Sequence, residues 1–226
     1  MDFGVIDRLI ARHGAEEVLR RVAPYLTEPR VARIEAVLEG RLDGVHVAVE
    51  RLEDPHNGAA VVRTAEALGV MHVHAIDVES GALHGSSTTQ GAYYWVHTYH
   101  HADRDAFLAQ LQARGVRLAG ALMEGTRTVD ELPVDRPLCV VFGNEKVGLS
   151  SELLAACDLT FRIPMVGMSE SLNLSVSAAI TLYQVTRARR AQLGAASDLG
   201  AEELSRLRAR YYARSIEARL LDGLFG

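Results

Sequence analysis

The sequence predicts an α/β fold, and two observations lead to that prediction. Short apolar runs of five or six residues alternate with segments of helical period between residues 45 and 190. Alternation of this kind is typical of a mainly parallel sheet with helices on both faces. The two ends carry helical patterns without strands. We therefore expect a helical extension at 1–43, an α/β core at 44–192 and a C-terminal helix within 193–226.

The N-terminal extension has apolar residues at helical spacing over residues 5–22, with a break near His13 and Gly14. This pattern predicts two short helices. Thr27 is a suitable cap for a third helix. Pro29 would then fall in the first turn, where its missing N–H needs no partner. We expect that helix to end near Gly40.

The predicted core elements follow in order along the chain. A loop rich in Ser, Thr and Gly at 80–91 interrupts them, and another at 193–200 precedes a last amphipathic helix. The expected strands are 45–50, 71–76, 93–99, 116–122, 138–142 and 159–163, and the expected helices are 58–68, 103–114, 150–157 and 172–190.

The bulk composition fits a globular protein. The chain has 226 residues, of which 48% are hydrophobic and 23% charged, enough for one full core plus extra helices. No apolar run approaches the ~20 residues of a membrane span, and the start lacks the basic segment of a signal peptide. We expect a cytoplasmic protein without a membrane partner. Cys139 and Cys157 lack metal-ligand spacing, so we expect core thiols and no metal site.

The charge distribution bears on a nucleic-acid partner. The net charge is −5, and Lys146 is the only lysine. RNA binding needs positive surface, so any such surface must be local and made of arginine. Arginines gather near both ends of the chain, and those at the start include Arg30, Arg33 and Arg41. The alternative is that each arginine is paired with a nearby carboxylate on a solvated helix face.

The first of three notable segments joins strand 45–50 to helix 58–68. Asn57 stands where a helix cap belongs, and capping is its simplest role. Arg63 lies six residues further on, among small or apolar neighbours. An arginine in such a setting is either a surface cation with a buried stem or a functional group.

The second segment is Phe142-Gly143-Asn144-Glu145-Lys146-Val147-Gly148, directly after an apolar strand. Two glycines around charged residues are common in any turn from strand to helix. A glycine at the end of a buried strand also permits close approach of a flat ligand such as adenosine.

The third segment runs from Ile163-Pro164-Met165 to Ser171-Leu172-Asn173. Ser169 or Ser171 as a plain helix cap is one interpretation. Asn173 and Ser175 are costly at an apolar helix start unless they form hydrogen bonds, which favours a functional interpretation.

In this order and spacing, the three segments resemble the motifs of the SPOUT-class RNA 2'-O-ribose methyltransferases, over about residues 27–190, and most resemble the members that methylate tRNA. The resemblance implies a deep trefoil knot, in which 164–190 is threaded through the loop after strand 138–142, and an S-adenosylmethionine site within it. It also implies a homodimer whose active site is completed across a two-fold interface.

The resemblance assigns roles to particular residues. The catalytic set that it implies is Asn57, Arg63, Glu145, Ser171 and Asn173. The cofactor set is Ala121, Gly143, Ile163, Met165, Ser171 and Leu172, and the expected RNA contacts are Arg30, Arg33 and Arg41. A guanidinium does not normally lose its proton in a protein. We therefore expect Arg63 to stabilise a developing alkoxide while another group takes the proton.

Two positions depart from the pattern of the class. Gln90 stands where relatives have a small residue, and Ala121 where they often have a threonine. The expected substrate is a D-loop guanosine of tRNA. The alternatives are ribosomal RNA as substrate, or an RNA-binding assembly protein with little turnover.

Overall fold

The structure is a computed structural model that describes residues 3–78, 83, 89 and 91–226. The chain divides into two compact units. One contains residues 42–195, and the other is formed by both ends of the chain, up to residue 41 and from residue 196. Position 90, where Gln90 departs from the family pattern, lies outside the described residues.

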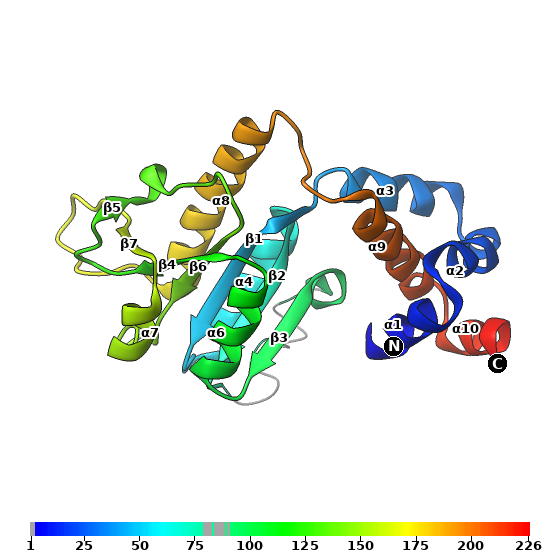
Figure 1. Cartoon of the computed structure of the whole chain (residues 1–226), viewed down its shortest axis with the longest axis horizontal. Helices are drawn as coiled ribbons and strands as arrows, with labels where there is room; N and C mark the ends of the chain where they lie inside the picture. The colour runs from blue at the N-terminus through cyan, green and yellow to red at the C-terminus, as the bar shows by residue number, and fades with distance from the viewer. Residues whose placement is uncertain (1–2, 79–82, 84–88, 90) are drawn as a thin grey trace. The chain divides into compact units, whose positions relative to one another are not determined.

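The first unit is built on a sheet of seven strands in the order β3-β2-β1-β6-β4-β7-β5 (Figure 1). All of the pairings between the described strands are parallel, so the predicted fold class is confirmed. The strands are β1 (Leu42–Glu50), β2 (Val70–Ile76), β3 (His97–His101), β4 (Arg117–Ala121), β5 (Arg127–Thr128), β6 (Leu138–Phe142) and β7 (Leu159–Arg162).

The predicted strand 93–99 is wrong in its first half. Residues Ala92–Trp95 form a short 3-10 helix, and the strand begins only at His97. Gly91 adopts a left-handed conformation with φ of 82° and accepts a hydrogen bond from the backbone of Tyr94, which closes the turn. The aromatic run that suggested a strand is thus overridden by the conformation that precedes it.

Helices cover both faces of the sheet. Helices α4 (Pro55–Ala67) and α8 (Leu174–Leu193) pack against one face, with Val47 and Val49 of β1 in the shared core. Helices α6 (Arg104–Ala113) and α7 (Ser151–Ala156) pack against the other face, where Ala48 lies. Successive side chains of β1 therefore pack alternately into two separate hydrophobic cores, one on each face of the sheet. Cys139 is fully buried in the second core, as predicted for a core thiol, and Cys157 is partly buried beside it.

A row of histidines crosses the same face as α6. The ring nitrogen Nδ1 of His46 on β1 lies 3.1 Å from Nε2 of His74 on β2, and Nδ1 of His74 lies 3.0 Å from Nε2 of His101 on β3. Phe107 of α6 meets His74 and His101 with its edge toward their rings. Burial lowers the pKa of His46 and of His74 well below the usual value, and the positive charge of His72 adds to the effect.

The second unit is a group of helices: α1 (Phe3–His13), α2 (Ala15–Val22), α3 (Glu28–Leu38), α9 (Ala201–Arg214) and α10 (Ala218–Phe225). The predicted break at Gly14 is confirmed, with φ of 82° between α1 and α2. The last helix was predicted to be continuous, but α9 ends at Arg214 and α10 begins at Ala218. No helix in the described part of the chain is long and apolar enough to cross a membrane.

Candidate active site

A cavity of about 790 Å³ opens at the carboxyl ends of β4, β6 and β7. Three loops form it, namely the residues just after β4, the loop 143–148 after β6, and residues 163–173 after β7. Ligand sites in parallel sheets lie at this edge of the strands, and cavities of ~300–1,000 Å³ hold small molecules. The cavity is therefore of a size and in a place that suit a cofactor.

The cavity brings the predicted cofactor residues together. Its lining includes Ala121, Gly143, Ile163, Met165, Ser171 and Leu172, and also Glu145 and Asn173 from the predicted catalytic set. Leu122 and Met123 also line it, with exposed fractions of 38% and 53%. Neither residue was among the predicted site residues, because the predicted strand 116–122 ran past Leu122, whereas β4 ends at Ala121 and leaves both residues at its carboxyl end.

One wall of the cavity consists of backbone without internal partners. Among the described residues, none from Pro164 to Leu172 forms a recorded hydrogen bond with the rest of the chain. Leu172, an apolar residue of this wall, is 37% exposed. Free backbone N–H and C=O groups beside apolar side chains suit the polar edge and flat apolar face of an adenine. The residues present therefore fit an adenosine-containing cofactor.

Gly143 lines the cavity and also has a structural role in the loop. A Cβ atom at this position would lie 2.1 Å from the carbonyl carbon of Gly148 and 2.1 Å from the nitrogen of Leu149. The backbones of Asn144 and Gly148 also pair with each other across the turn. Gly143 is thus required for the loop to close on itself, before any ligand is considered.

A chain of side-chain hydrogen bonds joins three loops at the cavity. The amide nitrogen of Asn57 donates to Glu145 Oε1 at 2.9 Å, and the amide nitrogen of Asn173 donates to Asn57 Oδ1 at 3.1 Å. Asn173 Oδ1 in turn accepts from the hydroxyl of Ser175 at 2.6 Å. Residues from α4, from the loop after β6 and from the start of α8 are therefore held in one arrangement.

The helix caps differ from the prediction in both places. Asp54 caps α4, because its side chain accepts from the backbone of His56, so Asn57 lies inside the first turn and is free to bond Glu145. Asn173 caps α8, where Ser169 or Ser171 was predicted, and accepts from the backbone of Ser175. Asparagine is as good a cap as serine, so the sequence pattern did not distinguish them.

Glu145 is held as a charged carboxylate. Partial burial raises its pKa, but hydrogen bonds from the Asn57 amide and from the backbone N–H groups of Glu53 and Asp54 outweigh burial, and the pKa lies below the usual value. A carboxylate with a lowered pKa and several donors is a weak base. The geometry suits an anchor that orients Asn57 more than a proton acceptor.

Arg63 lies apart from this group. Its side chain is exposed on α4, and no residue in the described part of the chain is its hydrogen-bond or ion-pair partner. It does not line the cavity, and neither does Asn57. A single chain therefore presents Arg63 as a free cation outside its own cavity.

The three predicted RNA-binding arginines differ in exposure. Arg33 is exposed, and Arg30 is partly buried, with its Nε donating to Ser215 Oγ at 3.1 Å. The prediction for Arg41 is contradicted, because its side chain is 1% exposed and its guanidinium lies 5.7 Å from the centre of the Tyr211 ring. The aliphatic part and the guanidinium of Arg41 are both buried, so the side chain does not present its charge to a phosphate at the surface.

Several other arginines near the ends of the chain pair with carboxylates, which is the alternative given above to RNA binding. Arg208 bonds Glu35, and Arg210 bonds Asp7. No group of three or more His, Cys, Asp or Glu side chains that could hold a metal occurs among residues 3–78, 83, 89 and 91–226.

Comparison with known proteins agrees with this architecture. Residues 44–183 match the SpoU rRNA Methylase family. The tRNA (guanosine(18)-2'-O)-methyltransferase of Thermus thermophilus is 40% identical over 164 residues, which cover 72% of this chain and 84% of that protein.

Solved structures give the same result. The A. aeolicus TrmH/SpoU tRNA modifying enzyme superposes with a TM-score of 0.73 and 30% identity, over 84% of this chain and 98% of that one. An AdoMet-bound rRNA methyltransferase from Sinorhizobium meliloti has a TM-score of 0.60 and 25% identity, over 66% of this chain and 57% of that one.

The parallel core, the cavity at its carboxyl edge and these matches together place the protein in the SPOUT class of methyltransferases. The chain belongs to the SpoU methylase family.

Proposed function

We propose that this protein transfers the methyl group of S-adenosylmethionine to the 2'-oxygen of a guanosine ribose in the D-loop of tRNA, as the name of the Thermus relative states for that enzyme. The observation that carries the proposal is the Glu145–Asn57–Asn173 chain at the cavity edge, which joins all three sequence motifs. A tRNA substrate implies that the protein acts in the cytoplasm.

The cavity residues hold S-adenosylmethionine, which supplies an electrophilic methyl group when bound. The free backbone groups near Met165 and Leu172 would hold the polar edge of the adenine, and the apolar side chains of Leu122 and Met123 in the same lining would favour its flat face. We also infer the trefoil knot, because residues 163–173 and 143–148 together form one cavity, as threading through the loop after β6 would produce.

Arg63 stabilises the ribose oxygen as negative charge develops on it. The guanidinium keeps its proton, so a water, a phosphate of the substrate or another group accepts the hydroxyl proton. Asn57 and Asn173 orient the groups around the reacting centre, with Glu145 as their anchor and Ser171 at the ribose. The exposed position of Arg63, without partners in the described part of the chain, leaves it available for this role.

The active form is a homodimer. An exposed apolar stripe starts at Leu172, just before α8, and continues along α8 with Val176, Ile180 and Tyr183, at 37%, 46%, 39% and 54%. These residues recur at helical spacing on one side, so a partner is needed to bury them. A second copy brings its Arg63 to the cavity that a single chain leaves without it. Light scattering that shows a monomer at working concentration would contradict the dimer.

The decisive experiment incubates the enzyme with methyl-labelled S-adenosylmethionine and separated tRNA and ribosomal RNA. We expect label in tRNA, on a nucleotide whose following phosphodiester bond resists alkaline hydrolysis because its 2'-oxygen is methylated. We expect no label in a tRNA in which guanosine 18 is replaced. Label confined to ribosomal RNA would favour the rRNA alternative, in line with the Sinorhizobium neighbour. Cofactor binding without transfer to either RNA would indicate an assembly protein.

A further inference from the structure

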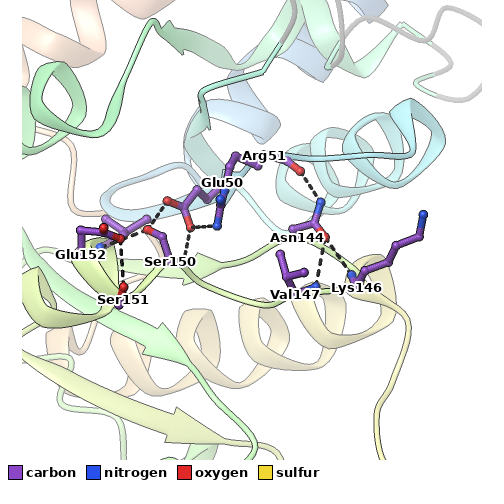
Figure 2. Close-up of polar contacts among 9 residues, drawn as sticks. Glu50, Arg51, Asn144, Lys146, Val147, Ser150, Ser151 and Glu152 are labelled. Atoms are coloured by element: carbon purple, nitrogen blue, oxygen red, sulfur yellow. Dashed lines mark hydrogen bonds and ion pairs between the residues drawn. The ribbon is translucent and has the colours of Figure 1, made fainter.

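The loop after β6 is attached near both of its ends to the end of β1, as Figure 2 shows. Near its start, the Asn144 amide nitrogen donates to the backbone oxygen of Arg51 at 2.7 Å. At its end, the Glu50 carboxylate accepts from the backbone nitrogen of Ser150 at 2.8 Å and from the Ser150 hydroxyl at 2.5 Å. Glu50 is the last residue of β1 and is 4% exposed.

The bonds to Glu50 fix the point at which α7 begins. Ser150 is the N-cap of α7, and its hydroxyl accepts from the backbone of Leu153 at 3.2 Å. Glu50 therefore determines where the loop 143–149 must end and, with the Asn144 anchor, how far it can move. Neither Glu50 nor Ser150 lines the cavity, so any effect on a ligand there passes through the loop.

The same short segment also leads into α4. After Glu50, the backbone nitrogens of Glu53 and Asp54 donate to the Glu145 carboxylate, and α4 with Asn57 follows at once. Residues 50–54 thus contact the loop after β6 at its beginning, middle and end. A displacement of this loop by about 1 Å would separate Glu145 from Asn57, and misplacement on that scale is enough to cost large factors in rate.

We propose that Glu50 is a positioning residue for the cofactor loop, acting through Ser150; the proposal rests on the proposed cofactor site. Its two buried acceptor oxygens hold the start of α7, and thereby hold Gly143–Gly148 in the shape that forms one wall of the cavity. A buried carboxylate is stable only with such hydrogen bonds, and both of its oxygens have one here.

The test measures the Kd of S-adenosylmethionine by calorimetry, together with the thermal midpoint, for four variants. Glu50→Ala should raise the Kd roughly tenfold or more, because the loop end loses both bonds. Glu50→Gln should stay within about threefold of wild type, since its amide can accept from the Ser150 nitrogen and donate to the hydroxyl. Ser150→Ala should fall between them.

Ser151→Ala is the matched control. Ser151 is the next residue, but its hydroxyl bonds only the exposed Glu152 among the described residues, so the Kd should not change. The double variant Glu50→Ala with Ser150→Ala should weaken binding by less than the product of the two single effects, because both substitutions remove the bond between the Ser150 hydroxyl and the Glu50 carboxylate.

An unchanged Kd in Glu50→Ala, or equal weakening by Ser150→Ala and Ser151→Ala, would overturn the positioning role. If Glu50→Ala does not fold, the comparison of the two serine variants decides the question alone. Wild-type protein that fails to bind S-adenosylmethionine would instead overturn the proposed function, and the positioning role with it.

Discussion

The amide of Asn57 donates a 2.9 Å hydrogen bond to the carboxylate of Glu145, a residue 88 positions later in the chain. Asn57 is 7% exposed whereas Glu145 is exposed, so this bond is partly shielded from water. It joins the first turn of α4 to the loop after β6, beside the bonds that the backbone nitrogens of Glu53 and Asp54 donate to the same carboxylate. The bond therefore aligns the helix that carries Arg63 with the cavity wall.

Substitution of Asn57 tests that alignment. Asn57→Ala should lower the free energy of unfolding by about 0.5–1.5 kcal/mol, because its bonds to Glu145 and Asn173 are lost while both of those exposed side chains can turn to water. Asn57→Asp should cost more, since it places a second carboxylate beside Glu145. Urea unfolding measures both. Glu53→Gln is the control, because its ion pair with Lys146 is exposed and should contribute little. An Asp variant as stable as wild type would contradict the Asn57–Glu145 contact.

Arg63 should separate activity from stability. Arg63→Ala should lower methyl transfer by about a hundredfold or more, because a cation facing developing negative charge is lost. The Kd for S-adenosylmethionine should stay within about threefold, since Arg63 does not line the cavity. The thermal midpoint should not move, because the side chain is exposed and has no partner among the described residues. Arg63→Lys should recover little activity.

Mixed dimers test whether Arg63 acts on the partner's cofactor. One chain carries Arg63→Ala, and the other carries Gly143→Ala, whose added Cβ would collide with the backbone of Gly148 and destroy the loop. Each variant alone should be inactive. If Arg63 serves the partner's cavity, the mixture contains one complete site per mixed dimer and regains activity. Mixed dimers that form but remain inactive would show that each Arg63 serves its own chain.

The fold could be predicted because its signals are local and repeated. Alternating apolar strands and helical segments are enough for a parallel sheet, and the structure places α4 and α8 on one face and α6 and α7 on the other. The segment at 93–99 was misread because three aromatic residues favour a strand, while the left-handed Gly91 just before them starts a turn instead. A conformation at one residue is not visible in composition.

The site was predictable only in part. The motifs located the cavity lining, but spacing could not show that Asp54 and Asn173 are the caps, or that Asn57 bonds Glu145 across 88 residues. Arg41 is a further case that spacing could not show. The sequence suggested an exposed arginine, but its side chain is buried against Tyr211, a residue 170 positions later in the chain. Which side chains meet depends on tertiary packing, which a single sequence does not record.

The buried histidines predict a pH dependence of stability. His46 and His74 have pKa values lowered by burial, so the unfolded chain binds protons near pH 6.5 that the folded chain does not. Stability should be full above pH 6.5 and should fall as the pH drops below it, by roughly 1.4 kcal/mol per pH unit for each ring.

Urea unfolding between pH 5 and pH 8 measures this slope. His74→Gln keeps polar groups at the centre of the row but removes one titrating ring, so its slope should be shallower than that of wild type. A stability that is level between pH 5 and pH 7 would contradict the neutral state of these histidines in the folded protein.

Arg33 and Arg41 lie eight residues apart but should behave in opposite ways. Arg33 is exposed and has no partner in the described part of the chain, so Arg33→Ala should weaken tRNA binding and reduce the slope of log K against log salt by roughly one phosphate contact. The thermal stability of Arg33→Ala should equal that of wild type. Arg41 is buried over Tyr211, so Arg41→Ala should lower the thermal midpoint while leaving the salt slope as in wild type. Filter binding across a salt series, with thermal unfolding of both variants, measures the two effects.

A smaller salt slope in Arg41→Ala, measured where that variant is fully folded, would contradict this prediction. It would indicate that Arg41 contacts RNA, and that its buried position opens when RNA binds.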